Sequence, residues 1–200
     1  KELRRTLFVS MGNEVVDMAR PNPFERLCRT LGGAKAEGFV WDSKFMPEED
    51  HGSVVLRTHY WGLKKIFEGY RLTGDAKTGA FEGNLSELQE HYSKFSKRRN
   101  AIFTPSEALV NLVAYEALRE KDFKRAIPIF SYNVELYPTS ANAYDSLGEA
   151  LERASRPLEA VASYEKAVQI GEKEQHPNLG VYIRNRDRVL RALSMEKKTP

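Results

Sequence analysis

The sequence is poor in the residues that build covalent cross-links and structural metal sites. Its 200 residues include one cysteine, Cys28, and four histidines. A single cysteine cannot form an internal disulfide, and scattered histidines without a second thiol provide no zinc-ligand spacing. These shortages exclude a disulfide scaffold and a structural zinc site, so we predict no metal and no cofactor.

Long apolar runs and an excess of one charge are also missing. The longest apolar stretches, 36–41 and 53–56, are far shorter than the roughly 20 residues that cross a bilayer. Lysine and arginine number 31 against 28 aspartates and glutamates, a net charge of +3, and the only basic run is 97–99. We therefore expect no membrane span and no nucleic-acid or membrane-surface partner.

What remains is the composition of a globular chain, with 41% hydrophobic and 30% charged residues. The chain begins at Lys1 with neither a methionine nor an apolar leader, so we expect its start to be a boundary within a longer or processed protein. The residues by themselves indicate no compartment.

The first third is predicted to be a strand, a helix and a second strand. Two short apolar runs, 7–11 and 38–41, have the length and composition of strands. Between them Pro23 suits a first helical turn and Gly32-Gly33 ends the apolar periodicity. Cys28 lies on the apolar face of this helix, so we expect a small core residue and not a nucleophile. The order strand, helix, strand predicts a parallel pair.

A second helix is predicted to follow Ser53, its expected N-cap. Its apolar residues are expected on one side, and its aromatic residues to pack against the sheet. The apolar set is Leu56, Tyr60, Leu63, Ile66, Phe67 and Tyr70. Thr-Gly and Glu-Gly pairs, which are typical of turns, predict a loop over 73–83. Beyond this loop the chain is predicted to be helical.

The helical part contains an internal repeat of 34 residues. The offset that aligns Ala126 with Ala160 also aligns Phe130 with Tyr164. The same offset aligns Val113 with Leu147, Ala114 with Gly148 and Ala117 with Leu151. This period is typical of stacked helical hairpins, in which small residues allow close helix approach and large residues fill the space between hairpins. We expect Leu147 to be buried, and the Arg-rich stretch 179–193 to be a terminal cap helix.

The repeat resembles a tetratricopeptide repeat over residues 105–172. The later copy carries Asn-Ala-Tyr-Asp-Ser-Leu-Gly at 142–148 and then Ala160, Tyr164 and Ala167, and the earlier, weaker copy carries Ala126, Phe130 and Pro138. The resemblance implies that Asn111, Tyr115, Asp145 and Glu149 lie on the inner helix face that such repeats use for partners. These residues do not form the Lys and Asn set that clamps a peptide carboxylate.

The first third resembles the last part of a bacterial esterase family of the α/β-hydrolase superfamily. The resemblance rests on residues 7–14, on Trp41-Asp-Ser-Lys-Phe-Met-Pro-Glu-Glu-Asp-His-Gly-Ser-Val at 41–54, and on Tyr60-Trp-Gly-Leu and Ile66-Phe67. The chain also resembles the siderophore-esterase-like subgroup that carries tetratricopeptide repeats after the hydrolase domain. Only this resemblance suggests export to a bacterial periplasm or surface.

The resemblance places two members of a serine-hydrolase triad in this chain. In that fold the acid follows a late strand and the histidine follows the last strand, positions that Glu14 and His51 occupy. Asp17 is a second candidate for the acid, and Asp50 is a third that adjoins the histidine. The nucleophile motif Gly-x-Ser-x-Gly is absent from these residues, and Ser10 and Ser53 lie in the wrong order or context.

The sequence therefore predicts a mostly α chain with a small β-α-β unit, the C-terminal end of an α/β-hydrolase fold joined to tetratricopeptide-repeat hairpins. We expect the hydrolase segment at 1–72, a linker with a helix at 73–104, and the repeat with its cap helix at 105–196. In the complete protein this implies a serine esterase that acts on a small ester. The nucleophile motif would then lie upstream of Lys1, and we expect this chain to be inactive alone. The alternative is a non-catalytic interaction module whose partner is another protein or a second copy.

Overall fold

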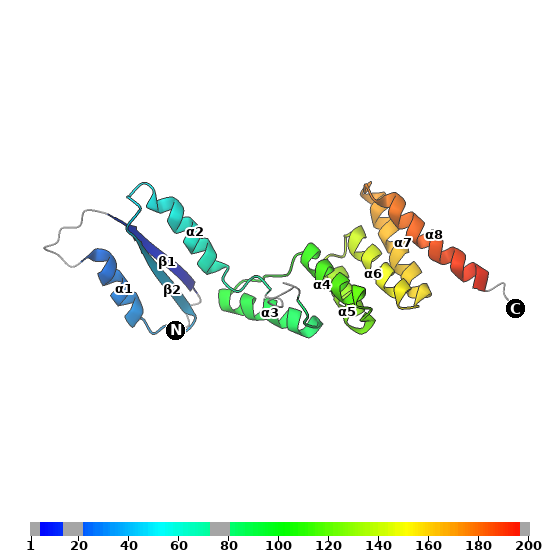
Figure 1. Ribbon diagram of the computed structural model, residues 1–200, viewed down its shortest axis with the longest axis horizontal. Helices are drawn as coiled ribbons and strands as arrows, with labels where there is room; N and C mark the ends of the chain where they lie inside the picture. The colour runs from blue at the N-terminus through cyan, green and yellow to red at the C-terminus, as the bar shows by residue number, and fades with distance from the viewer. Residues whose placement is uncertain (1–4, 14–21, 73–80, 197–200) are drawn as a thin grey trace. The chain divides into compact units, whose positions relative to one another are not determined.

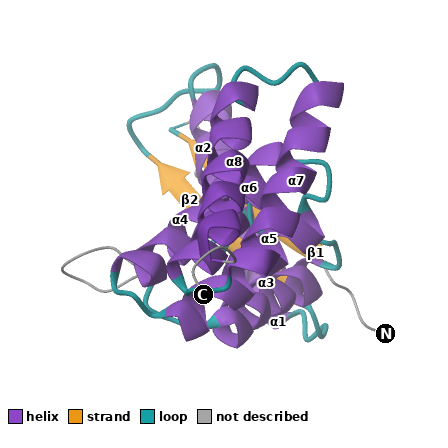
Figure 2. Cartoon of the chain, turned by 90° about the vertical axis from the view of Figure 1, so that its right-hand side faces the viewer, coloured by secondary structure: helices purple, strands orange, loops and turns teal. Residues whose placement is uncertain are grey.

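The computed structural model describes residues 5–13, 22–72 and 81–196. Within this part there are eight helices and one sheet of two strands, the only strands among the described residues (Figures 1 and 2). The chain divides into two compact units, Lys1–Leu72 with Tyr92–Phe103, and Thr73–His91 with Thr104–Pro200. A mostly helical chain with a small β-α-β unit is what the sequence predicted.

The sheet of the first unit is the predicted parallel pair, with longer strands than expected. β1 (Arg5–Gly12) runs beside β2 (Phe39–Met46), in a register that opposes Gly12 to Met46. α1 (Pro23–Gly33) connects them and begins at the predicted proline, where the Asn22 Oδ1 accepts a hydrogen bond from the Phe24 N–H at 2.9 Å. α1 has no buried residue, so Cys28 is only partly buried and the expected core position is wrong.

α2 (Val54–Ile66) packs on β1, on the side of the sheet opposite to α1 (Figure 1). Its contact face is made by small and polar residues: Gly62 approaches the ring of Phe8, and the hydroxyl of Thr58 bonds that of Ser10. The predicted apolar side points away, because close packing against β1 requires the small residues. Tyr60 is 59% exposed and Phe67 46%, so the expectation that these aromatic rings pack against the sheet is wrong.

An aromatic cluster of the first unit lies beyond α2. Tyr70 contacts Tyr92 and Phe95 of α3 (Leu85–Arg99), with ring centroids 5.5 and 5.4 Å apart, edge to face. Phe103 joins Phe95 at 4.9 Å. Among described residues 5–72, by contrast, Met46 is the only buried hydrophobic side chain. The sheet layer of this unit therefore has little core of its own.

The second unit is an array of helical hairpins with the predicted 34-residue period. The helices after α3 are α4 (Glu107–Arg119), α5 (Phe123–Leu136), α6 (Ala141–Arg153), α7 (Pro157–Lys173) and α8 (Leu179–Glu196). The caps repeat with the same period. Ser106 and Ser140 each accept a bond from the third following N–H, and Lys121 and Ser155 each end a helix with φ near +60°.

Burial follows the repeat alignment. Ala126 and Ala160 are both 0% exposed, as are Phe130 and Tyr164. Leu147 is the exception, because it is only partly buried where it packs against the cluster around Tyr164. Tyr182 and Val189 of α8 are buried, so α8 covers the last hairpin as a cap helix was expected to do. No described helix has the length and apolar character needed to cross a bilayer.

Candidate functional site

The first candidate region lies at the carboxyl ends of β1 and β2, where the loop after β1 begins beside the loop after β2. The Asn13 N–H donates to the carbonyl oxygen of Glu49 at 2.5 Å. At the neighbouring Gly12 a Cβ would lie 2.6 Å from that oxygen and 3.0 Å from the Asp50 carbonyl oxygen. Glycine is therefore required here, because any side chain would force the two loops apart.

The structure places His51 in the turn that joins β2 to α2, with an exposed side chain. Asp50 builds this turn: its Oδ1 accepts the N–H groups of Gly52 and Ser53 at 2.9 and 2.8 Å. Ser53 lies at the N-cap position of α2, as predicted, but its side chain makes no capping bond to the helix. Its Oγ accepts the Asp50 N–H at 3.0 Å instead. These N–H bonds hold the pKa of Asp50 below its ordinary value.

Of the three candidate acids, the structure describes only Asp50. Asp50 is already occupied by backbone N–H groups of its own turn. Glu14 and Asp17 lie outside the described residues. The described start of their loop, at Asn13, is bonded to the loop that carries His51. At Asn13 the end of β1 therefore lies beside the loop that carries His51.

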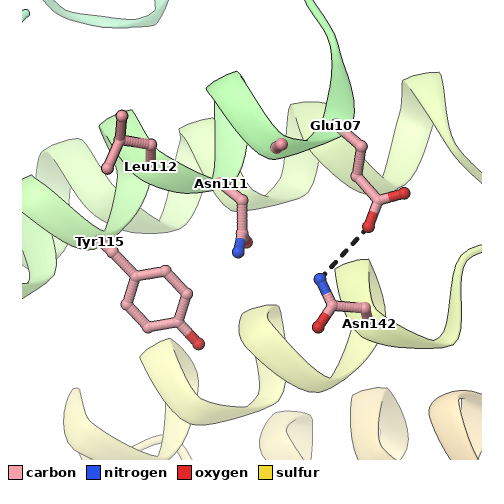
Figure 3. Close-up of a pocket in the computed structure, with 6 residues that line it drawn as sticks. Glu107, Asn111, Leu112, Tyr115 and Asn142 are labelled. Carbon is pink, nitrogen blue, oxygen red and sulfur yellow. Dashed lines mark hydrogen bonds between the residues drawn. The ribbon is translucent and has the colours of Figure 1, made fainter.

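The second candidate region is a pocket in the helical unit, formed by α4 and the start of α6 (Figure 3). Its volume is about 460 Å³, and it is lined by Glu107, Ala108, Asn111, Leu112, Tyr115 and Asn142. Asn111 and Tyr115 point from α4 toward α6, so two of the residues predicted for the inner helix face belong to it. Sequence reasoning missed Glu107 and Asn142. Glu107 lies one helix turn before Asn111 on α4, and Asn142 lies one turn before Asp145 on α6. Their polar side chains at these places were a usable signal.

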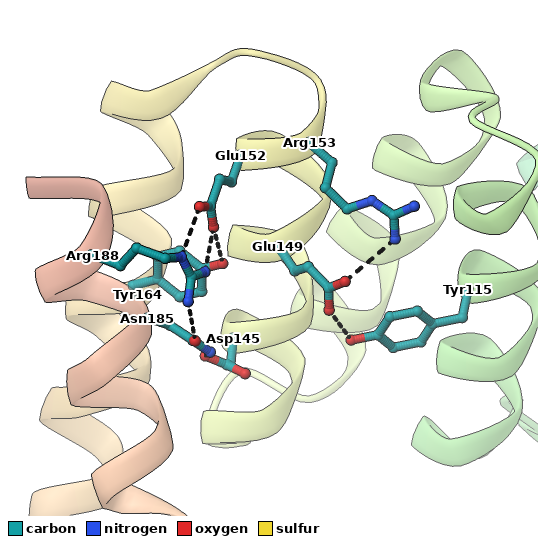
Figure 4. Close-up of polar contacts among 8 residues, drawn as sticks. All are labelled: Tyr115, Asp145, Glu149, Glu152, Arg153, Tyr164, Asn185 and Arg188. Atoms are coloured by element: carbon teal, nitrogen blue, oxygen red, sulfur yellow. Dashed lines mark hydrogen bonds and ion pairs between the residues drawn. The ribbon is translucent and has the colours of Figure 1, made fainter. Parts of the chain in front are cut away.

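Tyr115 connects the pocket to a polar network on α6 (Figure 4). Its hydroxyl donates to Glu149 at 2.9 Å, and Glu149 also accepts a bond from Arg153 at 3.4 Å. Burial is the main cause that raises the pKa of Tyr115 to about 12. The phenol is thus a neutral hydrogen-bond donor over the physiological pH range.

A second part of the network joins α6 to α8 (Figure 4). Arg188 holds Glu152 with two bonds, at 3.0 and 2.7 Å, which lowers the pKa of Glu152. Asp145 accepts a bond from the neutral amide of Asn185 at 2.9 Å, and burial raises the pKa of this carboxyl. The four residues predicted for the inner face thus lie on α4 and α6, but only two line the pocket.

In the part of the chain that the structure describes, no three histidine, cysteine, aspartate or glutamate side chains are arranged to hold a metal ion.

Comparison with solved structures supports the fold alone. The chain superposes on an uncharacterised protein from Capnocytophaga ochracea with a TM-score of 0.53 and 17% sequence identity, over 86% of this chain and 53% of that one. It thus spans about half the length of that neighbour. A MamA RS-1 ArsTM double mutant matches 70% of this chain and 89% of its own at 17% identity, with a TM-score of 0.32 that is too low to support an argument. No protein-family profile and no curated protein matches the sequence.

Proposed function

We propose that this chain is the C-terminal portion of a serine carboxyl-ester hydrolase, in which His51 is the catalytic base and Glu14 the acid that orients it. The observation that carries the proposal is the junction at the carboxyl ends of the two parallel strands. There the Asn13 N–H bonds Glu49 and Gly12 permits an approach that no other residue would allow. An acid and a histidine on these two loops would meet above the sheet edge.

In this mechanism the imidazole takes the proton of an upstream serine as that serine attacks the ester carbonyl. The acid fixes the imidazole tautomer and stabilises the imidazolium until the proton passes to the departing alkoxide. The exposure of His51 in a tight turn is consistent with a base that must reach a substrate and a serine from elsewhere in the protein. The thin core of the first unit, with Met46 as the one buried hydrophobic among described residues 5–72, supports the view that further sheet covers it in the complete protein.

The test is ester hydrolysis by the complete protein, with p-nitrophenyl butyrate as substrate. We expect His51→Ala to lower kcat by about a thousandfold or more, since a hydrolase without one triad member retains only the contribution of binding and the oxyanion hole. His59→Ala is the matched control, because His59 is exposed on α2 and its Nδ1 bonds the Val55 carbonyl oxygen of the same helix at 2.8 Å. Near-normal turnover of the His51 variant would remove this residue from the mechanism.

The choice of acid is tested in the same assay. Glu14→Gln should reduce kcat strongly, whereas Asp50→Asn should mainly loosen the start of α2, because Asp50 accepts two backbone N–H groups there. The 200-residue chain alone should hydrolyse no ester above buffer and take no label from a fluorophosphonate probe. Stoichiometric labelling of a serine in this chain would contradict the proposal.

The second candidate function is binding of a protein partner by the helical unit, which we propose to be a tetratricopeptide repeat. The 34-residue spacing of buried alanines, serine caps and left-handed turns supports that assignment. The observation that favours binding is the pocket on α4 and α6, which contains the exposed side chain of Leu112 next to polar groups. Such a combination of apolar surface and a few polar groups is typical of binding sites.

A further inference from the structure

The pocket between α4 and α6 contains a carboxylate that no cation neutralises. The Glu107 Oε1 accepts bonds from two neutral groups. The Ser140 hydroxyl donates at 2.8 Å, and the Asn142 amide donates at 3.2 Å, the bond drawn in Figure 3. Among the described residues no lysine or arginine forms an ion pair with Glu107, and its Oε2 receives no hydrogen bond. This oxygen is therefore available to a ligand.

Two carboxylates of α6 differ from Glu107 in this respect. Glu149 is paired with Arg153 and Glu152 with Arg188, so their charges are compensated within the unit. The six side chains that line the pocket include one acid and no base. The local charge is thus negative, which disfavours an acidic peptide or a nucleic acid and favours a cation.

The remaining lining residues suit a polypeptide. The amide of Asn111 lines the pocket, and its Oδ1 is buried without a partner among the described residues. Its Nδ2 is therefore the group that can donate to the carbonyl oxygen of a peptide bond. Leu112 beside it is 54% exposed, an apolar surface on which the methylene stem of a long basic side chain can lie.

We propose that this pocket binds a segment of another polypeptide through a lysine or arginine side chain whose cation pairs with Glu107. Asn111 bonds the main chain of that segment, and Leu112 contacts the stem of the basic residue. This proposal rests on the second candidate function and names the chemistry of its partner.

The test is selection from a library of randomised nonapeptides displayed on phage, with the immobilised 200-residue chain as target. Peptides are kept when they bind the wild-type chain and are not removed by prior passage over a Glu107→Gln chain. This substitution retains the shape of the side chain and an oxygen that accepts the Ser140 hydroxyl, while it removes the charge. Glu165→Gln, a substitution of an exposed residue on α7, is the control variant. Passage over this variant should remove the peptides that bind the wild-type chain. We expect the selected peptides to contain lysine or arginine at one common position.

Affinity measurements on one selected peptide then locate the ion pair. Replacement of its basic residue by glutamine and the Glu107→Gln change should each weaken binding about tenfold, and both together no more than either alone. Circular dichroism melting of the variants separates lost binding from lost folding. Selected peptides without a basic residue, or an affinity that Glu107→Gln leaves unchanged, would overturn the basic partner and leave the interaction function standing. Failure to select any peptide on the wild-type chain, even without the prior passage over the Glu107→Gln chain, would overturn both.

Discussion

At the scale of single residues, the helical unit contains a close approach between Gly148 and Tyr164. A Cβ at position 148 would lie 2.7 Å from two carbons of the Tyr164 ring. This ring is 0% exposed, and its hydroxyl bonds Glu152 at 2.9 Å, so both burial and a hydrogen bond hold it in place. The small residue that the repeat places here is thus required by helix packing and not by backbone conformation.

We expect Gly148→Ala to destabilise the chain by about 1–3 kcal/mol, although alanine has the higher helix propensity. Gly180→Ala is the matched control, because the added Cβ would meet only Arg184, at 3.5 Å. That change should be neutral or stabilising. The free energies of unfolding of both variants are measured by urea denaturation. Equal effects of the two changes would show that the contact with Tyr164 does not cause the loss of stability.

Asp145 gives the helical unit a pH dependence. Burial is the largest cause that raises its pKa, and Glu149 and Glu152 add to it. A carboxyl whose folded pKa is raised contributes stability below its unfolded pKa, near 3.9, and loses it as pH rises through the folded pKa. At neutral pH the charged form therefore costs stability.

We expect Asp145→Asn to melt at a higher temperature than the wild type at pH 7, with a difference that shrinks as the pH falls toward 4. Asparagine can still accept the bond from Asn185. Glu165→Gln, on the exposed surface of α7, should show no such pH-dependent difference. A variant less stable than wild type at pH 7 would contradict the assignment.

At the scale of elements, the hairpins are closed by equivalent left-handed residues. Ser155 has a φ of +59° and donates its N–H to the Glu152 carbonyl oxygen at 2.9 Å, and Lys121 has a φ of +61° at the corresponding place. Residues with a Cβ adopt this conformation at a cost, which glycine avoids.

We therefore expect Ser155→Gly to stabilise the helical unit by about 1 kcal/mol in urea denaturation. Ala162→Gly, at an exposed site inside α7, should destabilise it by a similar amount, because glycine weakens a helix interior. A loss of stability in both variants would mean that the left-handed turn is not retained in solution.

At the scale of the whole molecule, the two units differ in how far they complete their own cores. In the described residues the sheet consists of two strands, so each strand keeps one edge without a partner strand. Leu56 and Leu63 of α2 are 78% and 56% exposed beside it. Unpaired strand edges and apolar patches of this kind promote association.

We expect the 200-residue chain to self-associate at micromolar concentration, as measured by sedimentation velocity. Leu63→Glu should reduce this association without loss of stability, because the side chain is exposed. Leu158→Glu is the control, since Leu158 is 71% exposed on α7 of the other unit and should have no effect. A monomeric chain whose β1 amides resist hydrogen exchange as strongly as those of α6 would show that the first unit is self-sufficient.

The sequence by itself determined the element order, the parallel strand pair and the 34-residue repeat. These depend on local signals, such as Pro23 at a helix start, and on periodicity, such as Ala126 with Ala160. The candidates His51 and Tyr115 came instead from the resemblance to known families.

Only the tertiary structure decided which side of each element is covered, because a helix has two chemically plausible faces and its neighbour selects one. The packing of Gly62 and Thr58 on β1 turned Tyr60 outward, against the sequence-based expectation. Spatial neighbours likewise decided that Gly12 brings two loops together and that Glu107 lines a pocket with Asn142. Those contacts join residues distant in the chain, and no periodicity in the sequence encodes them.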